Sequence, residues 1–116
     1  MHPYKRSKRV GDLLREEIAD IVLNRVKDPR VGFVTVTSVK VSDDLSIARV
    51  YISVLKKEKT EETLMVLNSA SGFIRAEVGK RVRIKKLPRL EFLEDESIEY
   101  GERIDSILRK IKEEKS

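Results

Sequence analysis

The sequence predicts an α+β fold in which helices cover one face of a three-stranded mixed sheet. Three observations lead to this prediction. An amphipathic helix opens the chain, two runs rich in β-branched residues follow it, and an interrupted helix then leads into a third strand. A helical crossover between the second and third strands makes them parallel neighbours with a right-handed connection. The expected architecture is therefore two packed layers.

The first helix is expected over residues 7–27. Ser7 is a candidate N-cap, and the helix should end at Asp28-Pro29 because the residue before proline avoids helical geometry. The apolar residues of this segment recur in steps of three and four, which is the stripe of a helix that packs on a core. These residues are Val10, Leu13, Leu14, Ile18, Ile21, Val22 and Val26.

Residues 31–41 and 47–55 are predicted to form an antiparallel hairpin around a turn at residues 42–46, where Asp and Ser side chains can bond their own backbone. The second strand alternates cleanly, which gives it one core face and one face toward water. Its expected core residues are Ala48, Val50, Ile52 and Val54. The alternation of the first strand is imperfect and leaves its buried face undefined.

The crossover helix is expected over residues 60–80, with an interruption at Ser69-Ala70-Ser71-Gly72. A glycine costs a helix roughly 1 kcal/mol relative to alanine, so a helix–kink–helix is predicted. The third strand is expected over residues 82–92, and Pro88, which cannot donate to a ladder, places it at a sheet edge. A last helix is expected to begin at Ser97. Its apolar face would consist of Ile104, Ile107, Leu108 and Ile111.

Positive charge is concentrated in two blocks. The chain of 116 residues has a net charge of +5, and its first ten residues contain four bases and no acid. Residues 72–91 contain seven bases and two acids, whereas the chain from Phe92 onward has eight acids and five bases. Such blocks favour an anionic partner, above all a nucleic-acid backbone. With 5% aromatic residues, contact should depend on shape and backbone more than on base stacking.

Several other classes of protein are disfavoured. The chain has no cysteine to serve as a nucleophile, and its single histidine, His2, lies in a terminus expected to be flexible, so we expect no enzyme. The segment "GFIRAEVGKR" does not match a phosphate-binding loop, because six residues separate Gly72 from Gly79 and Arg81 replaces the Ser or Thr that holds magnesium. No cofactor or metal is expected, since turns and helix dipoles explain the acidic clusters.

No apolar run approaches the ~18 residues needed to span a bilayer, and the basic N-terminus lacks the apolar stretch of a signal peptide. We therefore expect a cytoplasmic protein without membrane partners. A length of 116 residues is typical of one domain, and we expect residues 1–116 to form a single monomeric domain with flexible ends at residues 1–6 and 113–116.

Three stretches also resemble a known family. The segment "SASGFIRAEVGKRVRIKKLPRLEF", followed by Asp95 and Ser97, is similar to the signature region of ribosome-binding factor A. The segments "VTSVKVSDDLSIARVYISVL" and "RVGDLLREEIADIV" extend the similarity over nearly the whole chain. The resemblance implies a KH-like fold of the bacterial type II kind. It also implies an Ala-x-Gly kink, here Ala70-Ser71-Gly72, in place of the Gly-x-x-Gly loop of ordinary KH domains, which this chain lacks.

The resemblance further implies a factor for late maturation of the small ribosomal subunit. Family members bind free 30S subunits rather than 70S ribosomes, support processing of the 5′ end of 16S ribosomal RNA and matter for cold adaptation. The alternative is a general single-strand-binding or protein-interaction module, which the sequence does not separate from the first reading. The candidate RNA-binding residues are Lys5, Arg6, Lys8, Arg9, Ser69, Ala70, Ser71, Gly72, Arg75, Lys80, Arg81, Arg83, Lys85, Lys86 and Arg89.

Overall fold

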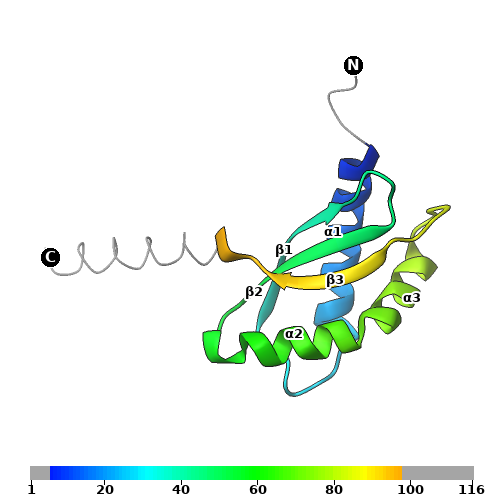
Figure 1. Ribbon diagram of the computed structural model, residues 1–116. Coiled ribbons are helices and arrows are strands. Elements are labelled where there is room, and N and C mark those ends of the chain that lie inside the picture. Colours follow the sequence, from blue (N-terminus) through cyan, green and yellow to red (C-terminus); the bar gives the residue numbers. More distant parts are fainter. Residues whose placement is uncertain (1–5, 98–116) are drawn as a thin grey trace, which may run out of the picture.

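The computed structural model describes residues 6–97 and contains the predicted order of elements (Figure 1). They are α1 (Arg6–Asn24), β1 (Val34–Val41), β2 (Ile47–Val54), the short 3-10 helix η1 (Lys57–Lys59), α2 (Thr60–Ser69), α3 (Ser71–Arg81) and β3 (Arg89–Glu94). Lys5 and the expected apolar face at residues 104–111 lie outside the described residues. None of the helices described is long and apolar enough to cross a membrane.

The sheet has the predicted topology. Its strand order is β1-β2-β3, with β1 antiparallel and β3 parallel to β2, so β2 is central and β3 is an edge strand. The helices pack on one face, and α1 passes behind the sheet in the view of Figure 1. All four predicted core residues of β2 are buried, whereas Arg49 and Tyr51 between them are not. The α+β sandwich of two layers is therefore confirmed.

A β-bulge explains the imperfect alternation of the first strand. The pairing of β1 with β2 shifts register between Val36 and Ser38, so Thr37 is the extra residue. Because of this insertion, Val36 and Val39 both face the core although three positions separate them. The Thr37 hydroxyl donates to the Tyr51 carbonyl and to the Asp95 carboxylate.

The first helix differs from its prediction at both ends. Ser7 lies inside α1 rather than capping it, and α1 ends at Asn24, three residues before Lys27. The amide of Val26 still bonds to the carbonyl of Ile21, at 3.2 Å, and the Val26 side chain packs against the core from outside the helix. An apolar residue can therefore continue the stripe after helical geometry has ended.

The predicted interruption of the crossover helix is present, and it lies at Ala70. This residue has φ −90° and ψ 5°, between the last residue of α2 and the first of α3. Its amide bonds to Val66 and its carbonyl accepts from Ile74, both at 2.9 Å, so the hydrogen-bond ladder continues through the bend. Gly72 belongs to the first turn of α3; it has no positive φ, and a Cβ added to it would meet no described heavy atom within 4 Å. The bend therefore does not require glycine for its backbone or for close packing within the fold.

The third strand begins seven residues later than predicted, at Arg89 instead of residue 82. It ends at Glu94, and residues 82–88 form a connecting loop instead of a strand. Val82, Ile84 and Leu87 from this loop pack against the core, which gives the segment the apolar spacing of a strand. Pro88 is buried immediately before β3 and therefore occupies no position in the ladder.

Candidate RNA-binding surface

The bend at Ala70 forms one wall of a surface pocket of about 320 Å³, which we call the kink pocket. Its other wall is the segment that follows α1, so two segments far apart in the sequence meet there. The lining residues are Arg25, Val26, Lys27, Asp28, Arg30, Val66, Ser69, Ala70 and Phe73. The two candidate residues Ser69 and Ala70 therefore border a pocket that the sequence did not reveal.

Two arginines at this pocket are held in place by carboxylates. The Asp28 carboxylate accepts from the Arg30 backbone amide at 2.9 Å, from its Nε at 3.0 Å and from its Nη2 at 2.8 Å. These hydrogen bonds lower the pKa of Asp28 to about 2. Arg25 Nη2 lies 3.4 Å from the Glu77 carboxylate, which is buried on α3. Both arginines at the pocket therefore have carboxylate partners within the fold.

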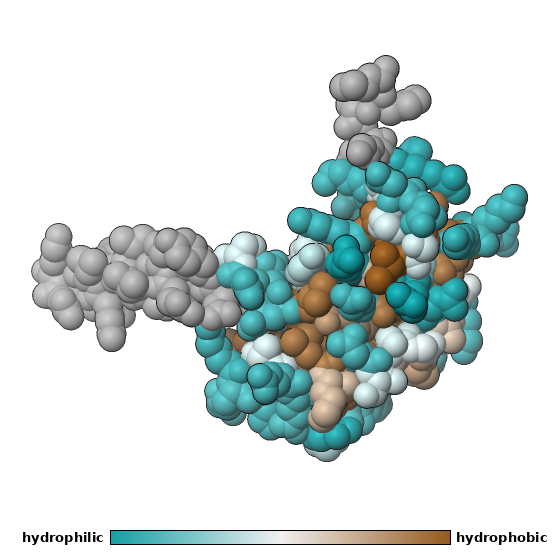
Figure 2. All heavy atoms as spheres, viewed as in Figure 1, coloured by the Kyte–Doolittle hydropathy of each residue, from teal (hydrophilic) through white to brown (hydrophobic). Residues whose placement is uncertain are grey.

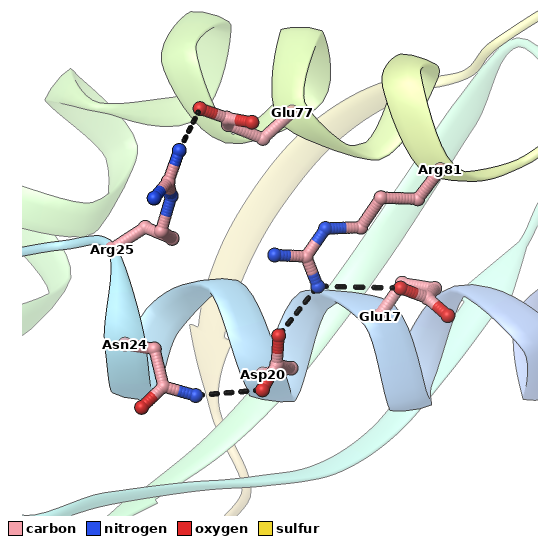
Figure 3. Close-up of polar contacts among 6 residues, drawn as sticks. All are labelled: Glu17, Asp20, Asn24, Arg25, Glu77 and Arg81. Carbon is pink, nitrogen blue, oxygen red and sulfur yellow. Dashed lines mark hydrogen bonds and ion pairs between the residues drawn. The ribbon is translucent and has the colours of Figure 1, made fainter.

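An ion-pair network joins α1 to α3 through the candidate residue Arg81 (Figure 3). Arg81 Nη1 lies 2.5 Å from Asp20 Oδ2 and 3.4 Å from Glu17 Oε2. Its hydrogen bond with Asp20 raises the pKa of Arg81 and lowers the pKa of Asp20. Lys80 lies 3.8 Å from Glu77. Both candidates thus have partners within the fold, and Arg81 in particular serves the packing of the two helices.

Arg75 also has a partner within the fold. Its Nε donates to the Pro88 carbonyl at 3.1 Å and its Nη2 to the Leu87 carbonyl at 2.7 Å. The guanidinium thus ties α3 to the connection that leads into β3 and holds that loop in position.

The loop between α3 and β3 presents the second basic block to solvent. We call Arg83, Lys85, Lys86 and Arg89 the basic loop; all four are exposed. In the described part of the chain, no hydrogen bond or ion pair engages the side chains of Arg83, Lys85 and Arg89. Asp44 in the β1–β2 turn has a pKa of about 2, mainly because Ser42 and Ser46 donate to it and to a smaller degree because Lys86 is near.

The first basic block lies at the same end of the molecule as the basic loop. Arg6, Lys8 and Arg9 are exposed in the first turn of α1; Figure 1 shows this turn at the top of the coloured ribbon and the α3–β3 loop at its upper right. The surface of this part is hydrophilic in Figure 2. The kink lies at the other end of α3, about 16 Å away for an eleven-residue helix. The candidate RNA-binding residues therefore form two groups, one at the basic loop and the first turn of α1 and the other at the kink.

Three bases that the sequence pattern does not single out line the kink pocket, namely Arg25, Lys27 and Arg30. A signal was available, because these three bases occur within six residues around Asp28-Pro29. Asp28-Pro29 was interpreted only as the end of a helix. Their approach to Ala70 depends on the packing of α1 against α3, which no local pattern specifies.

The family model for ribosome-binding factor A matches residues 6–108. The chain belongs to this family. It is 58% identical over 112 residues to ribosome-binding factor A of Thermodesulfovibrio yellowstonii, an alignment that covers 97% of this chain and 95% of the relative. The resemblance expected from the quoted segments is thus confirmed.

Two structural neighbours agree with the family assignment. The crystal structure of ribosome-binding factor A from Thermus thermophilus is 33% identical, with a TM-score of 0.68 over 76% of this chain and 94% of the neighbour. A homology model of the Thermus thermophilus factor, fitted into the cryo-EM map of its complex with 30S, is 33% identical with a TM-score of 0.65, over 75% of this chain and 92% of the neighbour. Both neighbours therefore support the fold of this ribosome-binding factor A family member.

Proposed function

We propose that this protein binds the free 30S subunit through 16S ribosomal RNA and assists late 30S maturation, including processing of the 16S 5′ end. The observation that carries this proposal is the family match, together with the neighbour fitted into a 30S complex. The protein acts in the cytoplasm, catalyses no reaction and supports growth in the cold.

The geometry adds a physical basis for RNA contact. The basic loop and the first turn of α1 present exposed cations at one end of the molecule. Contacts to phosphates need only positive side chains and free amides, and they position a protein on RNA without reading its sequence. Lys80 and Arg81, in contrast, contribute mainly through the fold, so the basic loop is the better part of the second block to test.

Sedimentation with purified 30S, 50S and 70S particles at two salt concentrations tests the proposal. We expect retention on 30S alone, with an affinity that falls by roughly 0.7 log units per log unit of salt for each single-strand phosphate contacted. Equal binding to all three particles, or to any RNA, would favour the general nucleic-acid or protein-interaction module instead.

A charge-reversed variant tests whether the basic loop contacts the 30S subunit. Arg83→Glu with Lys85→Glu should abolish retention on 30S, because neither side chain has a partner in the described fold that could offset the change. The matched control is Arg15→Glu with Lys56→Glu, which alters the net charge equally; both side chains are exposed, and among the described residues no hydrogen bond or ion pair engages them. If both double variants bind as the wild type does, the basic loop is not part of the interface.

The maturation role needs a separate measurement. In a strain depleted of its own factor, we expect the wild-type gene to restore the mature 16S 5′ end and growth in the cold. The basic-loop variant should restore neither. Restored 30S binding without restored 5′ ends would separate binding from maturation and reject the finer role.

A further inference from the structure

Apolar side chains, which we call the apolar floor, form part of the lining of the kink pocket, and one aromatic ring belongs to this lining too. Val26, Val66 and Ala70 line the pocket together with Phe73. The Phe73 side chain is 48% exposed, although the next residue, Ile74, is fully buried in the core. An exposed large apolar residue is more informative at the edge of a pocket than alone on a surface. Here it places an accessible aromatic side chain where a ligand could contact it.

The edge of the same pocket is basic. Three of its lining residues are bases and one, Asp28, is an acid. Among the described residues, no hydrogen bond or ion pair engages the Lys27 side chain, and Arg30 uses Nε and Nη2 for Asp28 but leaves Nη1 without a partner. Asp28 and Glu77 each pair with one of the arginines, so Lys27 and Nη1 of Arg30 are the donors that remain for an anion.

An apolar floor, an aromatic face and a cationic edge together match the parts of a nucleotide. Proteins that recognise RNA outside a duplex stack an unpaired base on an aromatic ring and hold its phosphate with Lys or Arg. A simple phosphate ion would not use the apolar floor, and an apolar peptide would not use the cations. A volume of about 320 Å³ lies at the small end of ligand pockets.

We propose that the kink pocket binds one unpaired nucleotide of RNA, with its base against Phe73 and its phosphate at Lys27 and Arg30. This inference rests on the proposed function and refines it, since it adds a base-contacting site to a surface that otherwise contacts only backbone. It also gives the residues at the bend a role, because Val66, Ala70 and Phe73 line this pocket.

A single tryptophan tests the stacking directly. The chain contains no tryptophan, so Phe73→Trp introduces one fluorophore at the pocket, and Met65→Trp on the exposed face of α2 is the matched control. The probes are the four ribonucleotide homohexamers and a 12-base-pair RNA duplex. We expect at least one hexamer to quench the pocket tryptophan, with no quenching by the duplex and none of the control tryptophan. No quenching at the pocket, or equal quenching of both tryptophans, or equal quenching by the duplex, would overturn the proposal.

Binding to 30S provides a second test. Phe73→Ala should weaken 30S binding roughly 5- to 100-fold, the range found when a stacked base loses its aromatic partner, whereas Met65→Ala should leave it unchanged. Thermal unfolding checks that both variants fold. If Phe73→Ala binds 30S as the wild type does, the pocket proposal fails and the proposed function stands. If the wild type does not bind 30S, the proposed function fails, and the hexamer titration still decides the pocket.

Discussion

Two helical glycines have opposite surroundings, and substituting each with alanine separates helix propensity from packing. Gly11 is buried in α1, where an added Cβ would lie 2.6 Å from the Val39 carbonyl oxygen and 3.6 Å from Val41 Cγ2. Gly72 has no described heavy atom within 4 Å of that position. Neither glycine has a positive φ, so alanine fits the backbone at both sites. The two substitutions therefore differ in the space that the fold leaves for a methyl group.

The expected changes in unfolding free energy have opposite signs. At Gly72, alanine should stabilise the protein by about 0.4–1 kcal/mol, because it restricts the unfolded chain and favours the helix. At Gly11, an ordinary contact begins at 3.4 Å, so α1 and β1 must separate by about 0.8 Å. Overpacking of this kind costs about 1–3 kcal/mol and disturbs Leu14 and Ile18, which pack on the same sheet. The net loss should be about 1–2 kcal/mol.

Thermal and urea unfolding of the two variants measure this difference. One kcal/mol corresponds to roughly 4–8 °C in a domain of this size, so Gly72→Ala should raise Tm by a few degrees and Gly11→Ala should lower it by about 4–16 °C. An unchanged urea m-value in both would show that the denatured state is the same. If Gly11→Ala is as stable as the wild type, the close approach of α1 to Val39 is not a real constraint.

Three further predictions concern polar groups. Arg81→Glu should lower Tm more than Lys85→Glu does, because it places a third carboxylate beside Glu17 and Asp20; equal effects would show that the network is dispensable. Thr63→Val should be neutral or stabilising by up to about 1 kcal/mol in urea unfolding, because the Thr63 hydroxyl is buried without a hydrogen-bond partner in the described chain. The Asp28 pKa is about 2 when folded and about 3.9 when unfolded, so its contribution is present above pH 4 and is lost as the pH falls toward 2. Asp28→Asn should therefore flatten the decline of the urea midpoint between pH 4 and pH 2, and an unchanged slope would contradict this reasoning.

The sequence predicted the elements of this fold well because local patterns and global packing agree in most of them. The core face of β2 follows from strict alternation, and the parallel pairing with β3 follows from the crossover. The errors occur where apolar residues reach the core from irregular backbone. Val26 and Ile84 both do so, and their spacing resembled a longer helix and a longer strand.

The candidate site was harder to predict because charge alone does not show where a side chain points. Arg75, Arg81 and Arg83 all belong to the second basic block, and the sequence alone does not distinguish them. In the structure, however, Arg75 donates to backbone carbonyls and Arg81 to carboxylates of the same chain. Their partners lie 12 to 64 positions away in the sequence, so only the packing of α3 reveals them. The kink pocket was missed for the same reason, because Lys27 meets Phe73 only through the packed helices.

This division of the basic residues determines how charge-reversal experiments on the protein must be interpreted. A substitution at Arg81 weakens the contact between α1 and α3, and the same contact positions Arg25 through Glu77 at the kink pocket. Loss of RNA binding by such a variant would therefore follow even if Arg81 never touched RNA. The basic loop lacks this ambiguity, since Arg83 and Lys85 support no described contact, and a loss of 30S binding there at unchanged Tm reports a direct interaction. Measuring unfolding and binding on the same variants thus distinguishes residues that hold the surface in shape from residues that form it.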